Sequence, residues 1–425
     1  DLVRSRGLGD VYKRQMPSES YKWHFIENRI REISALNGYR EVRTPVFEST
    51  DLFERGVGET TDIVQKEMYT FSPRKDKNNK EDSITLKPEG TAPAVRAFVE
   101  HGTYGDAQPT KMYYVIPCFR YEKPQAGRLR EFHQFGIEVF GTKDPSVDAE
   151  VINVAMSLFE SLGISSLELR VNSVGCPVCR KAYNDLLKEY LRPKMASMCA
   201  LCNDRFEKNP MRIIDCKEER CQAQLTDVPF IADHLCPDCQ DHFDRFKRSL
   251  ELIGLDYIVD KKIVRGLDYY TKTAFEIVSN NIGAQGTVCG GGRYDGLIAD
   301  IGGPDTPGVG FGLGLERLLM VLENSGIEIP EPRLCDIFIA YMGEVGEAES
   351  IRLVHKLRKA GVKAEKDYLG RSLKAQMKYA NKIKAAYVAV LGENEVNEGK
   401  AKIKNMADGS ETEVLLTNFG EFEYK

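Results

Sequence analysis

The chain has 425 residues, of which 42% are hydrophobic and 29% are charged. This length and composition fit a globular protein of two or three domains. No apolar run reaches the roughly 18 residues of a membrane helix and no secretory signal opens the chain, so we expect a cytoplasmic protein with no membrane partner. The net charge of −5 argues against capture of nucleic acid by overall charge.

The N-terminal segment of residues 1–15, DLVRSRGLGDVYKRQ, has no initiator Met and no clear hydrophobic period. We expect it to be a non-native leader joined ahead of Met16. In the next segment, apolar residues recur every three or four positions, which predicts a helix over residues 18–36. The stretch GYREVRTPVFE then turns at Gly38 and alternates into a strand that Pro45 interrupts.

Strand and helix patterns then alternate up to residue 175. Two short strand-like segments flank a polar turn, and two longer strand-like segments flank a Gly-containing turn. Both patterns are typical of paired strands. In chain order, the predicted elements are strands 68–71 and 83–88, a helix over 93–99, strands 111–122 and 131–141, a helix over 147–163 and a strand over 167–175.

A Cys-rich insertion is predicted over residues 175–245. With no export signal, eleven cysteines argue against a disulfide framework. Two CxxC pairs joined across a loop make a tetrahedral thiolate site, so we expect one or two structural Zn²⁺ ions. The alternative is a small core of reduced thiols. The eight candidate ligands are Cys176, Cys179, Cys199, Cys202, Cys216, Cys221, Cys236 and Cys239.

The main sheet is expected to resume with residues 261–279, 286–298 and 308–325, the last being a Gly-rich strand that runs into a helix. A Pro-broken linker follows at 329–333. Beyond it, strands and helices alternate, which predicts a small α/β domain over 333–425. In this domain, residues 352–384 hold eleven Lys and Arg against two acidic residues. Such a basic segment suggests a polyanionic partner, although it also fits a solvated helix face.

Four charged motifs are expected on strands of one antiparallel sheet. An isolated motif of this kind is usually a structural ion pair, but four together indicate a charged ligand on the face of the sheet. Arginine suits phosphate and carboxylate, and Glu122 with nearby acids suits Mg²⁺. The Gly-rich CGGGRYDG and GVGFGLGLE lack the Lys-Ser/Thr of a phosphate loop, and we interpret them as strand turns. The motifs are LKPEGT (86–91), FRYE with RLREFHQFGIE (119–138), RGLDYYT (265–271) and GLGLERL (312–318).

These motifs resemble a known family. FRYE with the later RLREF resembles motif two of class II aminoacyl-tRNA synthetases, GLGLERL resembles motif three, and the strand ending at Pro45 resembles motif one. RGLDYYT and GGRYDGL resemble the two histidine-specific signatures of histidyl-tRNA synthetases. The resemblance implies an α+β fold: a class II antiparallel sheet flanked by helices over 16–328, carrying the Cys-rich insertion, followed by an α/β anticodon-binding domain.

The resemblance also implies how ATP binds, bent over the sheet. Arg120 would contact the α-phosphate and Arg317 the γ-phosphate. Phe132 would stack on adenine, with Glu122 at the exocyclic amine. Arg128 would lie on the phosphates.

The implied histidine site uses the other motifs. Arg265 would be catalytic together with Arg120 and Arg317, as the cation near the carboxylate of histidine and the α-phosphate. For the tyrosines, the alternative is packing within strands, which aromatic residues favour. The residues implied at the ammonium are Glu89, Gly90, Thr91 and Gln134, and those implied at the imidazole are Glu138, Tyr269, Tyr270 and Tyr294.

The implied function is a homodimeric histidine–tRNA ligase, which activates L-histidine with ATP and Mg²⁺ and transfers it to the 3′ end of histidine tRNA. The C-terminal domain would bind the anticodon, and Gln125 would read the acceptor end. The alternative is a synthetase-like regulatory subunit of histidine biosynthesis, which typically lacks the last domain and has degraded signatures. Both signatures are intact here and about 90 residues follow Arg333, which favours the ligase.

Overall fold

The computed structural model describes residues 15–58, 61–72, 83–122, 128–280 and 286–424. The chain divides into two compact units, Asp1–Ile329 and Pro330–Lys425. Within the described residues, no helix has both the length and the apolar character that crossing a membrane requires. Three predictions lie outside the described residues: the leader except for Gln15, the polar turn at 75–80, and Gln125.

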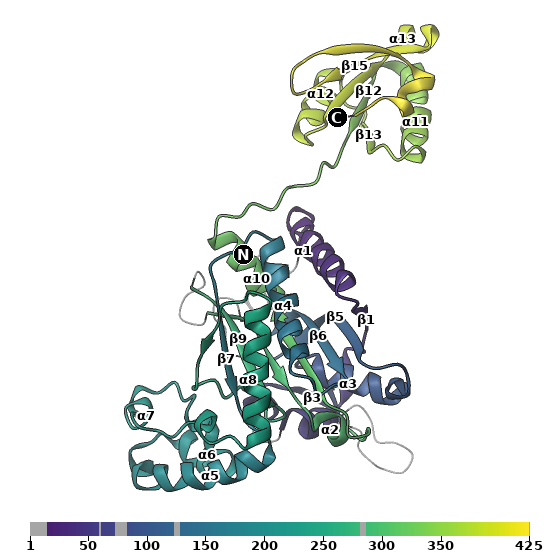
Figure 1. Ribbon diagram of the computed structural model, residues 1–425. Helices are drawn as coiled ribbons and strands as arrows, with labels where there is room; N and C mark the ends of the chain where they lie inside the picture. The colour runs from purple at the N-terminus through teal and green to yellow at the C-terminus, as the bar shows by residue number, and fades with distance from the viewer. Residues whose placement is uncertain (1–14, 59–60, 73–82, 123–127, 281–285, 425) are drawn as a thin grey trace. The chain divides into compact units, whose positions relative to one another are not determined.

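The first unit is built on an eight-stranded sheet in the order β1-β5-β6-β11-β10-β9-β7-β8 (Figure 1). Its pairs are antiparallel except β1 with β5 and β7 with β8. The predicted long hairpin is confirmed, because β5 and β6 pair in continuous register. The strands are β1 (Arg40–Glu41), β5 (Thr110–Phe119), β6 (Glu131–Phe140), β7 (Leu167–Ser173), β8 (Ile258–Val259), β9 (Thr271–Ser279), β10 (Thr287–Arg293) and β11 (Gly308–Gly314).

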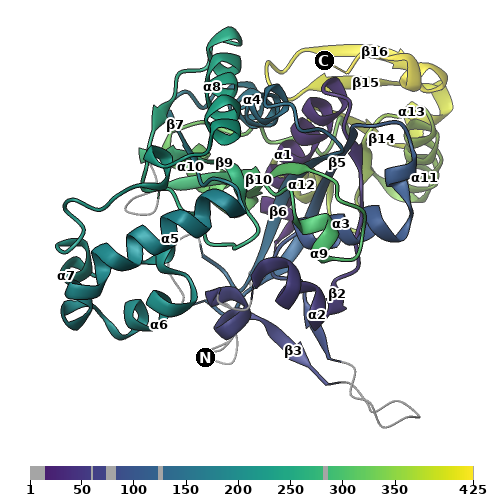
Figure 2. The same cartoon turned by 60° about the horizontal axis from the view of Figure 1, so that its bottom comes forward.

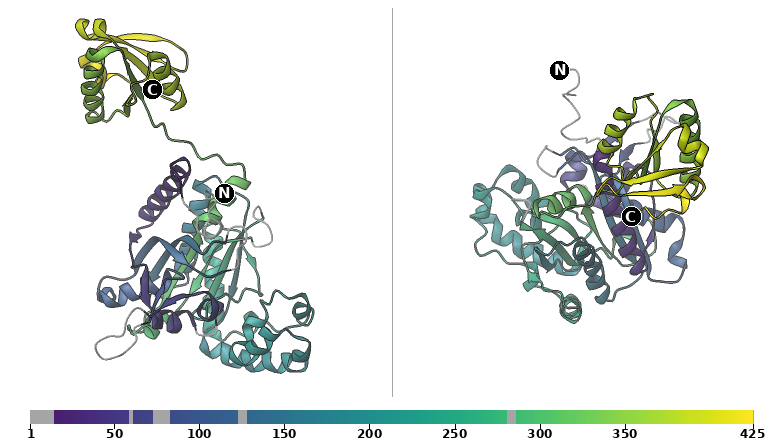
Figure 3. Two further views of the ribbon diagram at one scale, coloured as in Figure 1. Left: turned by 180° about the vertical axis from the view of Figure 1, so that it is seen from behind. Right: turned by 90° about the horizontal axis from the view of Figure 1, so that it is seen from above.

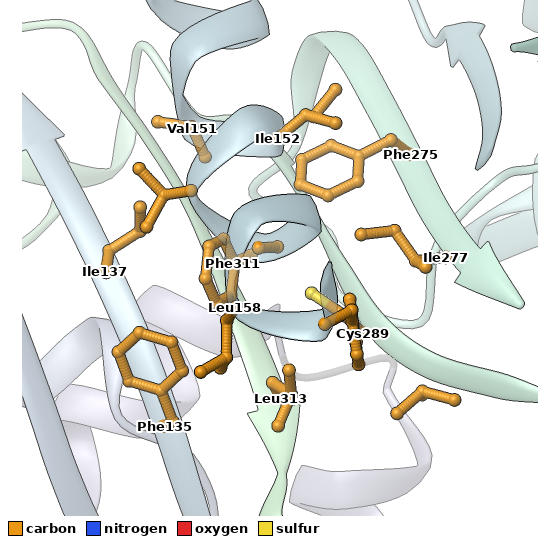
Figure 4. Close-up of a cluster of buried hydrophobic side chains, with 14 of the residues drawn as sticks. Phe135, Ile137, Val151, Ile152, Leu158, Phe275, Ile277, Cys289, Phe311 and Leu313 are labelled. Carbon is orange, nitrogen blue, oxygen red and sulfur yellow. The ribbon is translucent and has the colours of Figure 1, made fainter. Parts of the chain in front are cut away.

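One face of this sheet is covered by long helices and forms the main core. Alternate residues of β6 and β11, among them Ile137 and Phe311, point to α4 and are buried with Ile152 and Leu158 (Figure 4). Burying each such side chain contributes roughly 1.5–3 kcal/mol. The helices of this layer are α1 (Pro17–Leu36), α4 (Ser146–Ser161), α8 (Pro237–Leu252) and α10 (Leu315–Asn324).

The opposite face carries a second, smaller layer. There α3 (Thr91–Glu100) contacts β6 and α9 (Leu297–Asp300). Next to it lies a separate three-stranded sheet in the order β2-β4-β3 (Figure 2). Its strands are β2 (Phe47–Ser49), β3 (Tyr69–Phe71) and β4 (Ile84–Leu86). Between β2 and β3 lie α2 (Thr50–Phe53) and helical turns at Glu54–Gly58 and Ile63–Glu67. A 3-10 turn at Thr103–Gly105 follows α3.

Two expectations about the charged motifs are wrong. LKPEGT does not share the main sheet: its strand β4 pairs with β2 and β3, ends ahead of Pro88 and leads directly into α3. RGLDYYT is not a strand before Thr271, where β9 begins. The physical reason is the backbone of Arg265, which has φ +48°, a left-handed conformation that cannot continue a strand.

The Cys-rich insertion forms a helical lobe of the first unit, seen from behind in Figure 3. Helices and 3-10 turns connect its Cys pairs, and α8 returns the chain to the main sheet. The elements are α5 (Pro177–Leu191), α6 (Ala200–Lys208) and α7 (Glu219–Gln222), with 3-10 turns at Arg192–Ser197, Pro210–Ile213 and Ile231–Asp233.

The second unit is an α/β fold with a five-stranded sheet in the order β13-β12-β14-β15-β16. The predicted alternation is confirmed up to β14, and two antiparallel strands follow that the sequence did not predict. Its elements are β12 (Ile337–Tyr341), α11 (Gly343–Lys359), β13 (Ala364–Lys366), α12 (Leu373–Lys382), β14 (Tyr387–Leu391), α13 (Glu393–Glu398), β15 (Lys400–Asn405), β16 (Glu411–Leu415) and a 3-10 turn at Leu416–Glu421.

Candidate active site

The glycines of β10 and β11 make room for charged side chains on the sheet face opposite α4. At Gly310, an added methyl group would overlap the carboxylate of Glu138, and at Gly312 it would overlap the side-chain amide of Gln134. Both glycines lie inside a strand, so their interpretation as strand turns is wrong. Their function is steric: without side chains of their own, they let neighbouring polar groups lie flat on the sheet.

Glu138 is the centre of a buried polar cluster on this face. Its carboxylate is completely buried on β6. Its Oε1 accepts hydrogen bonds from Thr91 Oγ1 at 2.8 Å and from the Tyr114 hydroxyl at 2.9 Å, and its Oε2 accepts one from the Tyr294 hydroxyl. Burial raises the pKa of Glu138 to about 8, although the hydrogen bonds from these hydroxyls oppose the shift.

Tyr114 is a site residue that the sequence analysis missed. It lies on β5 directly opposite Gly136 of β6, where a methyl group would overlap its ring. An alternation signal was present, since Tyr114 and Ile116 share one face of the strand and Tyr113 and Val115 the other. Only the register of β5 against β6 shows that Tyr114 points toward Glu138, and register between strands is a long-range property.

Glu89 lies beside this cluster at the start of α3. Its carboxylate is buried and accepts hydrogen bonds from the backbone N–H of Thr91 at 2.7 Å and of Ala92 at 2.8 Å. Burial raises the pKa of Glu89, and these two N–H donors oppose the shift. The Gly90 N–H donates to Gln134 Oε1 at 2.9 Å. The four residues predicted to hold an ammonium group are therefore brought together.

The segment RGLDYYT brings a cation and aromatic rings to the same face. The guanidinium of Arg265 lies 5.5 Å from the centre of the Tyr270 ring and forms a 2.6 Å ion pair with Glu276 of β9. The Tyr269 ring lies 4.6 Å from that of Tyr270 and 5.5 Å from that of Tyr294. Glu276, which the sequence analysis did not identify, also accepts a hydrogen bond from the Thr287 hydroxyl at 2.9 Å.

A second group of charged residues gathers where β5 and β6 meet the start of α10. Arg128 lies 3.1 Å from Glu122, Arg120 lies 3.9 Å from it, and the guanidinium of Arg120 lies 5.2 Å from the Phe132 ring. Burial lowers the pKa of Arg317, and the charge of Arg128 lowers it further. Glu67 also lies within electrostatic range of Glu122, Arg120 and Arg128. Three guanidinium groups against these two carboxylates leave an excess of positive charge, which suits a polyphosphate.

The two groups of charged residues are joined at Pro88. The Arg120 Nε donates to the Pro88 carbonyl at 2.8 Å, so it lies next to the buried Glu89. The buried Glu89 with its backbone donors, the Glu138 carboxylate beside the aromatic cluster and the group of guanidinium side chains are therefore continuous. This arrangement suits joining an amino acid to a nucleoside triphosphate.

The eight cysteines of the insertion form two groups of four. Each group has its four sulfur atoms within 4.8 Å of one another, and none is in a disulfide. The first group, called the inner cluster, is Cys176, Cys179, Cys236 and Cys239. The second, called the outer cluster, is Cys199, Cys202, Cys216 and Cys221.

The two clusters fit a tetrahedral metal ion. In the inner cluster, the Sγ of Cys176 lies 3.6 Å from that of Cys179 and 3.9 Å from that of Cys236. In the outer cluster, the Sγ atoms of Cys199 and Cys216 are 3.9 Å apart. Zinc with four thiolates at about 2.3 Å requires sulfur atoms about 3.8 Å apart. Burial opposes ionisation of Cys176 and Cys199, but hydrogen bonds from backbone N–H groups and from neighbouring cysteine thiols outweigh it and lower the pKa of each to about 7.

Comparisons with known proteins cover nearly the whole chain. A family model described as Histidyl-tRNA synthetase matches residues 12–196 and 215–318, which leaves out 197–214, and one described as Anticodon binding domain matches 336–422. A Histidine--tRNA ligase of Caldanaerobacter subterraneus is 60% identical over 411 residues, covering 97% of this chain and 96% of the relative. One of Clostridium perfringens is 57% identical over 405 residues, covering 95% of each.

Among solved structures, the apo histidyl-tRNA synthetase of S. aureus is similar with a TM-score of 0.82 and 40% sequence identity. The match covers 97% of this chain and 98% of that one. A histidyl-tRNA synthetase of Nostoc has the same fold, with a TM-score of 0.67 at 20% identity.

Proposed function

This chain belongs to the histidyl-tRNA synthetase family, and we propose how its residues perform the ligation of histidine to tRNA that defines it as an aminoacyl-tRNA ligase. The single observation that carries the proposal is the buried Glu138 among three hydroxyl donors, on the same sheet face as the Arg265 cation that lies over the Tyr270 ring. A regulatory subunit is not the function of this chain, since its relatives at 55–60% identity are ligases.

Histidine lies with its imidazole against Glu138. The ring donates an N–H to this carboxylate and packs between Tyr270 and Tyr294, with Tyr269 behind them. An amino acid without that N–H leaves a buried carboxylate unpaired, which is why such sites reject analogues by roughly 10⁴ to 10⁵-fold. The ammonium group is held by Glu89 and by its neighbours Gly90, Thr91 and Gln134.

ATP occupies the positively charged end of the site. Arg120 and Arg265 contact the α-phosphate, Arg317 the γ-phosphate, and Arg128 the remaining phosphate oxygens. Adenine stacks on the ring face of Phe132 that Arg120 leaves open, and its amine donates to Glu122. The sequence contains no Walker-type loop, and guanidinium groups take its place.

The family uses Mg²⁺ with ATP, and the residues of this chain fit that ion. Glu67 lies beside Glu122: its carbonyl accepts the Tyr121 N–H at 2.7 Å, burial raises its pKa, and the charge of Glu122 raises it further. Two adjacent carboxylates plus phosphate oxygens are a typical Mg²⁺ environment. When bound, the ion neutralises phosphate charge.

In the first step, a carboxylate oxygen of histidine attacks the α-phosphorus. An O–P bond forms, the bond from the α-phosphorus to the bridging oxygen breaks, and pyrophosphate leaves. The nucleophile is already ionised at neutral pH, so no side chain has to remove a proton. Arg265 and Arg120 neutralise the charge that develops on the α-phosphate.

In the second step, a hydroxyl of the terminal adenosine of histidine tRNA attacks the carbonyl carbon, and AMP leaves. The second unit, with its basic residues 352–384, binds the anticodon end by contacts to phosphate. Gln125 contacts the acceptor end. The reaction takes place in the cytoplasm.

The molecule acts as a homodimer. The exposed apolar side chains of Val46, Phe47 and Phe71 on the small sheet support an interface there.

The proposed function also assigns the domains. Residues 16–328 form the catalytic domain, which contains the insertion over residues 175–245. Residues 333–425 form the anticodon-binding domain.

The insertion holds two structural Zn²⁺ ions, one in the inner and one in the outer cluster. Four thiolates complete a tetrahedral ion and leave no position for substrate, so these ions stabilise the fold of the lobe. A core of reduced thiols is less consistent with two sets of four sulfurs at metal-like spacing.

The test of the active site is Arg265→Ala. We expect ATP–pyrophosphate exchange with histidine to fall by about 10²-fold or more, while the Kd for histidine in calorimetry rises less than tenfold, because Arg265 acts mainly on charge that develops in the transition state. Exchange near the wild-type rate would contradict its role.

A further inference from the structure

The insertion is hydrogen-bonded to residues 265–270, which we call the histidine-site loop. Arg180 Nη1 donates to the Asp268 carbonyl at 3.3 Å, Asn209 Nδ2 donates to Asp268 Oδ1 at 2.8 Å, and Arg212 Nη1 donates to the Gly266 carbonyl at 3.3 Å. All three donors belong to the insertion and all three acceptors to the loop. Asp268, for which the sequence suggested no function, receives two of these bonds.

Each donor is positioned by one of the cysteine clusters. Arg180 directly follows Cys179 of the inner cluster, on the first turn of α5. Asn209 and Arg212 lie between Cys202 and Cys216 of the outer cluster, at the end of α6 and in the turn that follows it. Closing the outer cluster around a metal ion therefore fixes both ends of the segment that carries Asn209.

The loop needs such support because its backbone is strained. Arg265, which is not a glycine, has φ +48°. A left-handed conformation of this kind is unfavourable for a residue with a side chain and persists where surrounding contacts enforce it. An open pocket of about 280 Å³, lined by Arg180, Asn209 and Asp268 among others, lies beside the contacts. Tyr269 and Tyr270 also belong to the same buried apolar cluster as residues of the insertion. The polar contacts at the pocket therefore add direction to an apolar contact that itself has little orientational preference.

The charge of Arg180 matches a metal ion in the inner cluster. Its Nε and Nη2 are buried and have no hydrogen-bond partner among the described residues. It lies within electrostatic range of Asp268 and of three inner-cluster cysteines. Four thiolates around Zn²⁺ carry a net charge of −2, and this charge stabilises a buried guanidinium.

We infer that Asp268 is a positioning residue, through which the two zinc-bound clusters hold the histidine-site loop in the conformation that presents Arg265 and Tyr270 to histidine. The inference rests on the proposed ligase function and on the proposed zinc sites. It goes beyond the family pattern, because Asn209 and the first outer pair, Cys199 and Cys202, lie in the residues 197–214 that the family model leaves unmatched.

The experiment measures zinc content, unfolding midpoint and ATP–pyrophosphate exchange for the full chain and for Asn209→Ala, Asp268→Ala and the double variant. We expect two zinc ions per chain and wild-type unfolding midpoints in Asn209→Ala. The KM for histidine should be about tenfold higher because Tyr270 moves, and kcat for exchange should be lower because Arg265 moves. In the Asp268→Ala background, Asn209→Ala should raise the KM for histidine less than twofold further, because both changes remove the same contact.

Two further variants separate the explanations. Cys202→Ser should leave one zinc ion per chain and weaken histidine binding in calorimetry to the same extent as Asn209→Ala. Asp204→Ala, an exposed change on the same helix α6, should match the wild type in every measurement. A KM for histidine in Asn209→Ala equal to that of the wild type, or independent effects of Asn209 and Asp268, would overturn the inference. Absence of histidine-dependent exchange in the wild type would instead overturn the ligase function.

Discussion

Under the proposed function, Glu138 is the residue whose protonation should control histidine binding. Because burial raises its pKa to about 8, it is mostly neutral at pH 7 in the empty site, whereas the ionised carboxylate is the stronger acceptor for an imidazole N–H. Tight binding therefore favours release of the proton, and the cost of that release decreases as pH rises. We expect kcat/KM for histidine in the exchange reaction to increase from about pH 6.5 to about pH 8.5.

The control for this prediction is Glu138→Gln, which cannot ionise. Its kcat/KM for histidine should be lower by about 10²-fold or more and should show no rise over the same pH range. The KM for ATP should be constant with pH in both proteins. A flat profile for histidine in the wild type would contradict the assignment.

Gly290 tests the steric function of the glycine-rich strands. A methyl group at this position would lie 2.5 Å from the guanidinium nitrogens of Arg265, so Gly290→Ala should displace that cation without removing any ligand-binding group. We expect kcat for exchange to fall on the order of 10²-fold, the cost of misplacing a reacting group by about 1 Å. Gly105→Ala, which meets no atom within 4 Å, is the matched control and should keep the wild-type rate.

At the residue scale, the sequence predicted which side chains matter but not how they meet. Arg265 and Glu138 stand out because a charged residue inside an apolar strand pattern is costly to bury. Their partners, Tyr114 and Glu276, could not be found in the same way, because each belongs to another strand and reaches the site only through the register of the sheet. Their own sequence surroundings look like ordinary strand residues.

At the scale of elements, α12 presents a basic stripe. Lys374, Lys378 and Lys382 are exposed and recur every four residues, so they lie along one side of the helix. We expect the triple change of these lysines to Glu to raise the KM for tRNA in aminoacylation and to reduce the slope of log affinity against log salt by about three, one for each lost phosphate contact.

Histidine-dependent exchange without tRNA should be unaffected by this triple variant, since the stripe lies in the second unit. As a matched control, the lysines can be replaced by Arg, which keeps the charge and should keep the affinity for tRNA. Unchanged tRNA affinity in the Glu variant would show that α12 is only a solvated face.

Periodicity predicted the long elements well and the irregular ones poorly. Helices α1 and α4 and the hairpin of β5 and β6 have clear patterns of period 3.6 or 2 and appear close to their predicted bounds. The β-branched and aromatic residues around RGLDYYT imitate a strand, but contacts from the insertion and the left-handed Arg265 prevent one. The strands β15 and β16 escaped prediction because they carry many charged residues.

At the scale of the whole molecule, the residues of interest are divided between two compact units. The first unit contains the candidate active site and the two cysteine clusters, and the second unit carries the basic helix. The sequence predicted this division from the Pro-broken linker and from the change in strand and helix alternation. The grouping of the eight cysteines into two clusters could not be predicted. The structure groups the CxxC pair at 176 with the pair at 236, but sequence spacing favours this grouping no more than other groupings of the pairs.

The most direct test is amino-acid-dependent ATP–pyrophosphate exchange of the full chain with each of the twenty amino acids. The arrangement around Glu138, Arg265 and the ATP-binding arginines predicts exchange with histidine and at most background exchange with the other nineteen, together with charging of histidine tRNA. Exchange driven by a different amino acid, or none with histidine, would contradict the account.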